Sequence, residues 1–181
     1  MLRQRMTVEA FDLWARGQDR DYEYIRGEAL EVVSNNYSSQ VGILIGGMLA
    51  VYVTQNQLGH VTGADGGYQV MGERYIPDAA FVSRSKQPQP SREAYNSNPP
   101  DLAIEVLSPS DDVDKIRIKI ANYLAAGTVV WVLDPDAKVA EVYRPGQSVV
   151  VIDENGTLDG GELLPGFQVR VGDVFPPEAD V

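Results

Sequence analysis

The sequence predicts an α/β fold, a mixed β-sheet flanked by helices, and two hydrophobic patterns support it. Three stretches repeat apolar residues every three or four positions, as amphipathic helices do. Between them lie short apolar or alternating runs bounded by Gly, Pro, Asn and Asp, as in strands and turns. The 181 residues show no internal repeat and no shift of composition that marks a boundary, so we expect one domain over 1–181.

The N-terminal part predicts a helix, two strands joined by a turn, and a second helix. Thr7 is a suitable cap for the first helix, and Gly17 ends it. The second helix has an apolar stripe on one face, interrupted by glycines. Gly42 and Gly46 fall on one ridge, which core packing or a subunit contact would explain, core packing being the simpler. The expected bounds are 7–16 and 38–57 for the helices, and 22–25 and 29–33 for the strands.

The middle and C-terminal parts predict strands around a third helix. Ser110 or Asp111 is the expected cap of that helix, and Gly127 its end. The segment 83–100 contains four prolines and predicts a surface loop, while the apolar residues of 160–175 predict a tail packed on the core. The expected strands are 60–64, 68–71, 75–82, 102–107, 129–133, 138–143 and 149–152.

The composition excludes several kinds of chemistry. The absence of cysteine rules out disulfides, thiolate catalysis and Cys-ligated zinc, and fits a reducing cytoplasm. The single histidine, His60, rules out a histidine-rich metal site and is best explained by a structural role beside Gly59. Without a secretory signal or an apolar run of membrane-spanning length, the sequence predicts a cytoplasmic protein with no membrane partner. The net charge of −11 argues against non-specific binding to polyanions.

Two apolar segments each contain a carboxylate where ionisation is costly. Asp78 lies in 76–82 and Glu105 in 101–107, and both segments predict buried strands. A buried ionised carboxylate costs several kcal/mol unless a cation or hydrogen-bond donors compensate it. If the two strands are neighbours, the alternation of side chains can bring both carboxylates together, and such oxygen ligands favour Mg²⁺ or Mn²⁺. The pattern therefore predicts one shared cation.

Further residues fit this chemistry. Glu28 is a third acid just past the turn at Gly27, and Lys119 falls at the margin of the buried face of the third helix. The Lys119 stem can pack on apolar neighbours while its ammonium reaches the end of the sheet. Acids with a nearby lysine are what metal-dependent phosphodiester hydrolysis needs, because the metal activates a water and the lysine orients it or stabilises developing charge. Arg74 and Lys115 are candidate phosphate contacts.

Several segments form an ordered set along nearly the whole chain, which is more specific than any one of them. They are YEYIRGE (22–28), IPDAAFV (76–82), PDLAIEVLSPS (100–110), KIANYLAAG (119–127), VWVLDP (130–135) and LLPGF (163–167). In these segments the chain resembles the Uma2 family of restriction endonucleases, of the PD-(D/E)XK nuclease superfamily. The resemblance implies a restriction-endonuclease-like mixed sheet with flanking helices, and a metal-dependent endonuclease acting on DNA.

The resemblance also implies roles for particular residues. It makes Asp78 and Glu105 ligands of Mg²⁺ or Mn²⁺, with the carbonyl of Val106 as a further ligand. It matches Glu28 to an early acidic residue of the superfamily.

The chain departs from the family pattern at two places. Two residues after Glu105, where the superfamily usually has a lysine, stands Leu107, and this points to Lys119 on the following helix. The histidine that relatives often carry near the start of the second helix is absent, since residues 36–39 are Asn-Tyr-Ser-Ser.

Structural interpretations stay open for each of these residues. Glu105 can form an ion pair with a buried Arg or Lys such as Arg74, and Asp78 can begin a turn. Glu28 can be an exposed hairpin residue and Lys119 a solvated or snorkelling one. The rival function is a catalytically weak or inactive module that acts in binding or in homodimeric assembly, which the acidic balance favours. A third interpretation, an ordinary α/β structural domain, predicts no metal binding.

Overall fold

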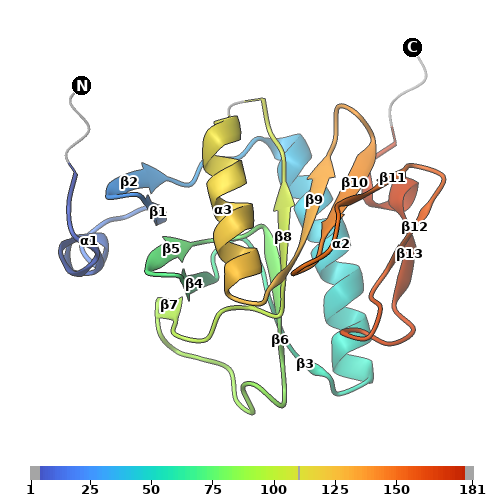
Figure 1. The fold of residues 1–181 in the computed structure, drawn as a ribbon, viewed down its shortest axis with the longest axis horizontal. Helices are drawn as coiled ribbons and strands as arrows, with labels where there is room; N and C mark the ends of the chain where they lie inside the picture. The colour runs from blue at the N-terminus through green and yellow to red at the C-terminus, as the bar shows by residue number, and fades with distance from the viewer. Residues whose placement is uncertain (1–4, 110, 178–181) are drawn as a thin grey trace.

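The described residues form two large neighbouring β-sheets and a separate two-stranded sheet near the C-terminus, with helices packed around them (Figure 1). The computed structural model describes residues 5–109 and 111–177. The elements in chain order are α1 (Val8–Ala15), β1 (Tyr22–Ile25), β2 (Glu28–Glu31), α2 (Asn36–Gln55), β3 (Gly59–Thr62), β4 (Gly67–Val70), β5 (Glu73–Tyr75), β6 (Ala79–Ser83), β7 (Tyr95–Asn96), β8 (Leu102–Val106), α3 (Val113–Ala125), β9 (Val129–Asp134), β10 (Val139–Tyr143), β11 (Val150–Asp153), β12 (Thr157–Asp159), β13 (Gln168–Arg170) and the 3-10 helix η1 (Val171–Val174).

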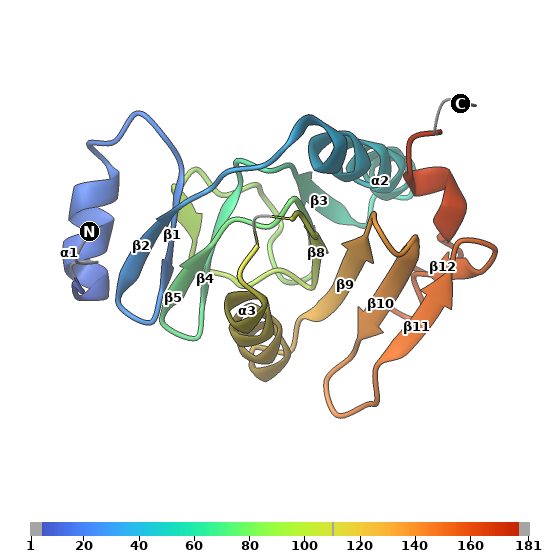
Figure 2. The same cartoon turned by 90° about the horizontal axis from the view of Figure 1, so that it is seen from above.

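The larger sheet is mixed and has the strand order β11-β10-β9-β8-β6-β3. Strands β8 and β9 run parallel because α3 crosses between them, whereas the other neighbouring pairs are antiparallel. Helix α2 covers one face of this sheet and α3 packs on the other (Figure 2). This arrangement confirms the predicted mixed sheet with flanking helices.

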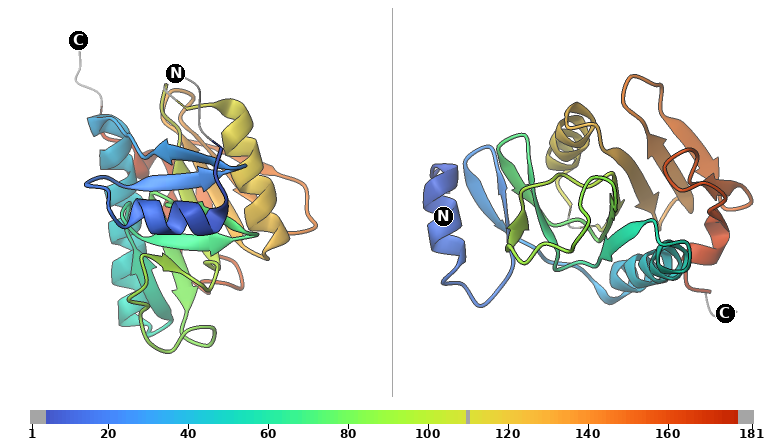
Figure 3. Two further views of the ribbon diagram at one scale, coloured as in Figure 1. Left: turned by 90° about the vertical axis from the view of Figure 1, so that its left-hand side faces the viewer. Right: turned by 90° about the horizontal axis from the view of Figure 1, so that it is seen from below.

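The smaller sheet has the order β2-β1-β5-β4-β7, and α1 lies against it (Figure 3). Phe11 anchors α1, with its ring centroid 5.2 Å from that of Tyr24 and 5.9 Å from that of Tyr95. Beyond β11, the C-terminal segment packs on the α2 side of the larger sheet, which confirms the predicted tail. Its buried apolar residues are Leu158, Leu164, Phe167, Val171, Val174 and Phe175.

The helix caps follow the predictions in one case and correct them in another. Thr7 caps α1 by accepting a hydrogen bond from Ala10 N–H at 3.3 Å. Helix α3 is capped by Asp112, so the prediction of Asp111 was wrong. Asp111 instead accepts a hydrogen bond from the backbone N–H of Ser108. The alternative cap, Ser110, lies outside the described residues.

The single strand predicted over 75–82 is two strands in different sheets. Strand β5 belongs to the smaller sheet and β6 to the larger one, with residues 76–78 between them. Pro77 has no N–H to donate, so a sheet ladder cannot continue through it unbroken. Asp78 therefore lies just before a strand rather than in the middle of one. The predicted surface loop over 83–100 likewise contains β7, which pairs with β4.

The glycines of α2 allow the helix to approach β6 closely. A Cβ at Gly42 would lie 3.5 Å from the Asp78 Cβ, and a Cβ at Gly46 would lie 3.3 Å from that of Ala79. Core packing, the simpler of the two explanations for this ridge, is confirmed. The same contact fixes the position of Asp78 against α2.

Candidate active site

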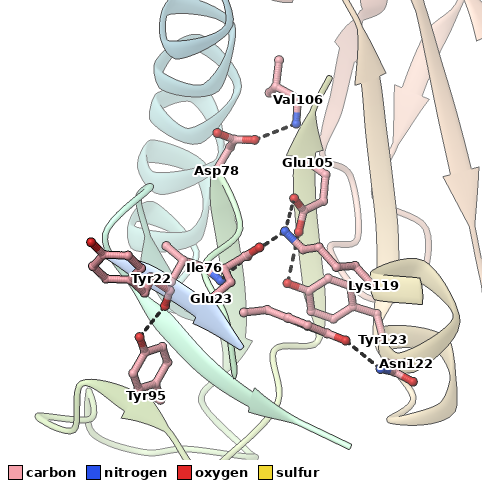
Figure 4. A network of polar contacts seen from close by, with 11 residues as sticks. Tyr22, Glu23, Ile76, Asp78, Tyr95, Glu105, Val106, Lys119, Asn122 and Tyr123 are labelled. Atoms are coloured by element: carbon pink, nitrogen blue, oxygen red, sulfur yellow. Dashed lines mark hydrogen bonds and ion pairs between the residues drawn. The ribbon is translucent and has the colours of Figure 1, made fainter. Parts of the chain in front are cut away.

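Strand pairing brings Asp78 and Glu105 to the same end of the larger sheet. Strands β6 and β8 are antiparallel neighbours with Ala79 opposite Ile104, and extending this register by one residue sets Asp78 opposite Glu105. The Val106 N–H donates a hydrogen bond to Asp78 Oδ2 at 2.7 Å (Figure 4). Glu105 of β8 and Asp78, the residue just before β6, are therefore neighbours at this end of the sheet.

Lys119 reaches Glu105 from α3, on the face of the sheet that α3 covers. Its Nζ lies 2.7 Å from Glu105 Oε2, and both side chains are only 6% exposed. Tyr123, one turn later on α3, donates a hydrogen bond from its hydroxyl to Glu105 Oε1 at 3.2 Å. Both oxygens of Glu105 thus accept from α3, which fixes the orientation of its carboxylate (Figure 4).

Glu23 is a site residue that the sequence predictions missed. It comes from β1 in the smaller sheet, and its Oε1 lies 2.8 Å from Lys119 Nζ. The same oxygen accepts a hydrogen bond from the Ile76 N–H at 2.8 Å. A signal was present in the sequence, because period-two alternation places Glu23 on the same face as Ile25, which is buried. The Lys119 ammonium is held between carboxylates from both sheets.

Glu28 and Arg74 lie apart from this cluster. Glu28 Oε2 is 3.7 Å from Lys115 Nζ, and Glu28 does not line the pocket around Glu105, although Lys115 does. The buried Arg74 forms a two-pronged pair with Asp12, at 2.9 Å through Nε and 2.7 Å through Nη2. Glu105 therefore pairs with a buried lysine, and not with the arginine considered from the sequence.

The cluster opens into a pocket of about 270 Å³ between the two sheets and α3. Among the described residues of its lining, acidic side chains outnumber basic ones by six to two. The acids are Glu23, Glu31, Asp78, Glu105, Asp111 and Asp112, and the bases are Lys115 and Lys119. A cavity with this balance is suited to hold a cation.

Burial and charge shift the proton affinities in the cluster. Burial raises the pKa of Asp78 to about 6, although the Val106 N–H and the Lys119 charge oppose the shift. Burial also raises the pKa of Glu105; Lys119 opposes this change, whereas the negative charges of Glu23 and Asp78 reinforce it. Burial alone would lower the pKa of Lys119, but Glu105 and Glu23 outweigh it and hold that pKa above its usual range. The lysine is therefore the charged partner.

A closed metal cage made only of side chains is absent from residues 5–109 and 111–177, where no group of three His, Asp or Glu side chains is placed to hold one ion. The arrangement offers the carboxyl groups of two neighbouring residues, Asp78 and Glu105, and the nearby main chain of Val106 in the lining of one pocket. Mg²⁺ is commonly bound this way, through one or two carboxylates, with water or substrate phosphate as the other ligands. The residues present fit such an open site.

Comparisons with known proteins identify the family and the fold of this chain. The model of the Uma2 family, described as "Putative restriction endonuclease", matches residues 8–172. A crystal structure described as that of a putative nuclease belonging to DUF820, from Anabaena variabilis, superposes with a TM-score of 0.83 at 22% sequence identity. The match covers 94% of this chain and 97% of the other, so the two share a fold. No curated protein sequence matches this chain.

Proposed function

This chain belongs to the Uma2 family, and from that membership and from the acids of its pocket we propose that it is a divalent-metal-dependent nuclease. The proposed reaction is hydrolysis of phosphodiester bonds in DNA.

The excess of acidic over basic side chains in the pocket carries this proposal. Glu23 and Glu105 both pair with the ammonium of Lys119, and Asp78 lines the same pocket, so the carboxyl groups here outnumber this ammonium. Ionised groups removed from water are costly unless they are paired. A second cation would complete the compensation, and the pocket gives it a route from solvent.

Asp78 and Glu105 would hold this cation, Mg²⁺ or Mn²⁺, together with the Val106 carbonyl. Such a metal supplies a Lewis acid that neutralises phosphate charge and lowers the pKa of a bound water. The chain's own contribution is to place the carboxyl groups of Asp78 and Glu105 in the lining of one pocket and to orient Glu105 through Lys119 and Tyr123.

Lys119 and Lys115 would interact with the phosphate groups of the substrate. Lys119 keeps its proton because Glu105 and Glu23 surround it, so a positive Nζ stays beside the place where a phosphate would gain charge. Lys115 lines the same pocket and can meet a phosphate at its mouth. Glu28 would act on that contact through its pairing with Lys115. Glu23 is a positioning residue that holds Lys119 in place.

Plasmid nicking tests the proposal. The purified chain with Mn²⁺ should convert supercoiled plasmid to the nicked form, and Glu105→Gln and Asp78→Asn should each lower the rate by at least about a hundredfold while retaining a folded circular dichroism spectrum. Glu154→Gln, in the exposed turn between β11 and β12, is the matched control and should cleave like the unmodified chain. Absence of cleavage with every divalent metal, or full activity of both site variants, would overturn the proposal.

One observation favours the rival, a nuclease-fold module that binds or assembles without cleaving. Lys119 already forms ion pairs with the carboxylates of Glu23 and Glu105. In addition, Leu107 stands where the superfamily usually has its lysine. A purified chain that binds DNA or itself, yet cleaves nothing with any metal, would support this second function.

A further inference from the structure

Helix α2 presents an apolar stripe to solvent on the side away from the core. Ile43 and Val51 are 71% and 58% exposed, and Gly47 lies between them at a spacing of one helical turn. We call these three residues the α2 stripe. Figures 2 and 3 show α2 along the outside of the larger sheet. Its length and composition would suit a membrane span, yet its other face is packed in the core.

Gly47 has no packing reason within the chain. Gly42 and Gly46 give room to Asp78 and Ala79, but a Cβ at Gly47 would meet nothing within 4 Å. A glycine inside a helix costs about 1 kcal/mol relative to alanine. A backbone left bare at the centre of an exposed apolar stripe is the feature that lets a second helix approach closely.

The charge distribution points to the same face. The chain carries a net charge of −11, yet residues 36–55 contain no Asp, Glu, Lys or Arg. Two copies of so acidic a chain repel each other over most orientations. Contact through an uncharged face avoids the burial of like charges, so α2 suits a second copy of this chain.

We propose that α2 is the contact surface of a homodimer, in which the α2 stripes of two copies cross antiparallel about a twofold axis at Gly47. The spacing of the stripe is symmetric about Gly47, so this axis sets Ile43 of one copy against Val51 of its partner at both ends. A twofold contact must be self-complementary in this way. Ile43 and Val51 supply the apolar side chains of the contact, and Gly47 leaves the space in which the two helices approach each other.

A cavity next to the stripe extends the surface. It has a volume of about 300 Å³ and lies between α2 and the end of β3, with Val61, Gly63 and Ala64 on its far wall. Stable dimers bury about 800 Å² on each partner, more than one helix face supplies. The cavity wall gives the partner helix further area. Because Asp78 lines this cavity as well as the candidate active site, the two sites of the dimer would lie near the axis.

Sedimentation of the full chain tests the proposal independently of nuclease activity. The chain should sediment with twice its 19.8 kDa mass at micromolar concentration. Val51→Glu and Gly47→Leu should each raise the dissociation constant of the dimer at least about tenfold, because one buries a charge and the other fills the gap. Val151→Glu is the matched control, since Val151 is also a valine with 58% exposure but lies on the edge strand β11.

The possible results distinguish a second copy of the chain from other partners of α2. Dissociation by the two α2 changes with a dimeric control supports the proposal. A monomeric unmodified chain overturns it, whether or not the chain then floats with phospholipid vesicles. A dimer that survives both α2 changes, or one that Val151→Glu dissociates instead, also overturns it and moves the contact to the sheet edge.

Discussion

Glu23 shows what governs prediction at the scale of single residues. Asp78 and Glu105 could be selected from the sequence because apolar neighbours surround each of them. Glu23 stands between two tyrosines in a half-buried strand, and its partner Lys119 is far away in sequence. Glu28 was selected in its place because it follows a recognisable turn. Local patterns identify a buried acid, whereas the identity of its partner depends on how the two sheets meet.

The pKa of Asp78 gives a prediction for stability against pH. Burial raises it from 3.8 to about 6, so the folded chain holds this proton more tightly than the unfolded chain does. The stabilisation that the protonated Asp78 gives the folded chain is therefore fully present below the pKa that Asp78 has in the unfolded chain. This stabilisation is lost as pH rises through 6. The variant Asp78→Asn lacks this dependence. Between about pH 4 and pH 7, the free energy of unfolding of this variant should rise by about 2 kcal/mol relative to that of the unmodified chain.

Urea unfolding of both proteins without divalent metal, at a series of pH values, measures this difference. A difference between the two free energies that stays constant with pH would show that the Asp78 carboxyl is not held in its protonated form by burial.

At the scale of elements, the helices were the most predictable parts. The apolar period of α2 and α3 gives their extent to within a few residues, because one face of each packs on a sheet. The sequence predicts a single strand over 75–82 because the apolar pattern continues across Pro77. In the structure the two halves of this segment belong to different sheets. Strand β7 has two residues and pairs only with a distant strand, so no local pattern marks it.

The two adjacent glycines of α2 give a matched prediction. Gly46→Leu should lower the free energy of unfolding by about 2 kcal/mol, because even a Cβ there lies 3.3 Å from Ala79 and the side chain must push α2 from β6. Gly47→Leu has open space and a better helix former, so it should raise that free energy by up to about 1 kcal/mol.

Chemical denaturation at a concentration where the chain is monomeric compares the two. Equal effects of the two substitutions would contradict the close packing of α2 on β6, and with it the placement of Asp78.

At the scale of the whole molecule, the site lies where the two sheets meet. Glu23 comes from the smaller sheet, Glu105 from the larger one, and Asp78 from the link between them. The sequence led to one mixed sheet with flanking helices, and that class is correct. The division into two sheets could not be predicted, because it depends on strand pairings between residues far apart along the chain, such as Tyr24 with Arg74.

The overall charge makes a prediction for DNA binding. The chain has a net charge of −11, and Lys115 and Lys119 are the only basic side chains that residues 5–109 and 111–177 contribute to the pocket. Each neutralised phosphate contributes about −0.9 to the slope of log affinity against log salt, so the slope with duplex DNA should be about −2. Fluorescence anisotropy at several KCl concentrations, with Ca²⁺ as the divalent ion, measures it. A slope of about −5 or steeper would reveal a basic surface that this account does not contain.

The central claim is that one divalent cation is shared by the carboxylates of Asp78 and Glu105. A crystal of the chain soaked in Mn²⁺ tests it directly, because manganese gives an anomalous difference peak at its own position. The account predicts a peak within about 2.5 Å of oxygens from both residues. A manganese peak only at another place in the molecule would contradict the claim. So would the absence of any peak in a crystal where Lys119 still pairs with both Glu23 and Glu105.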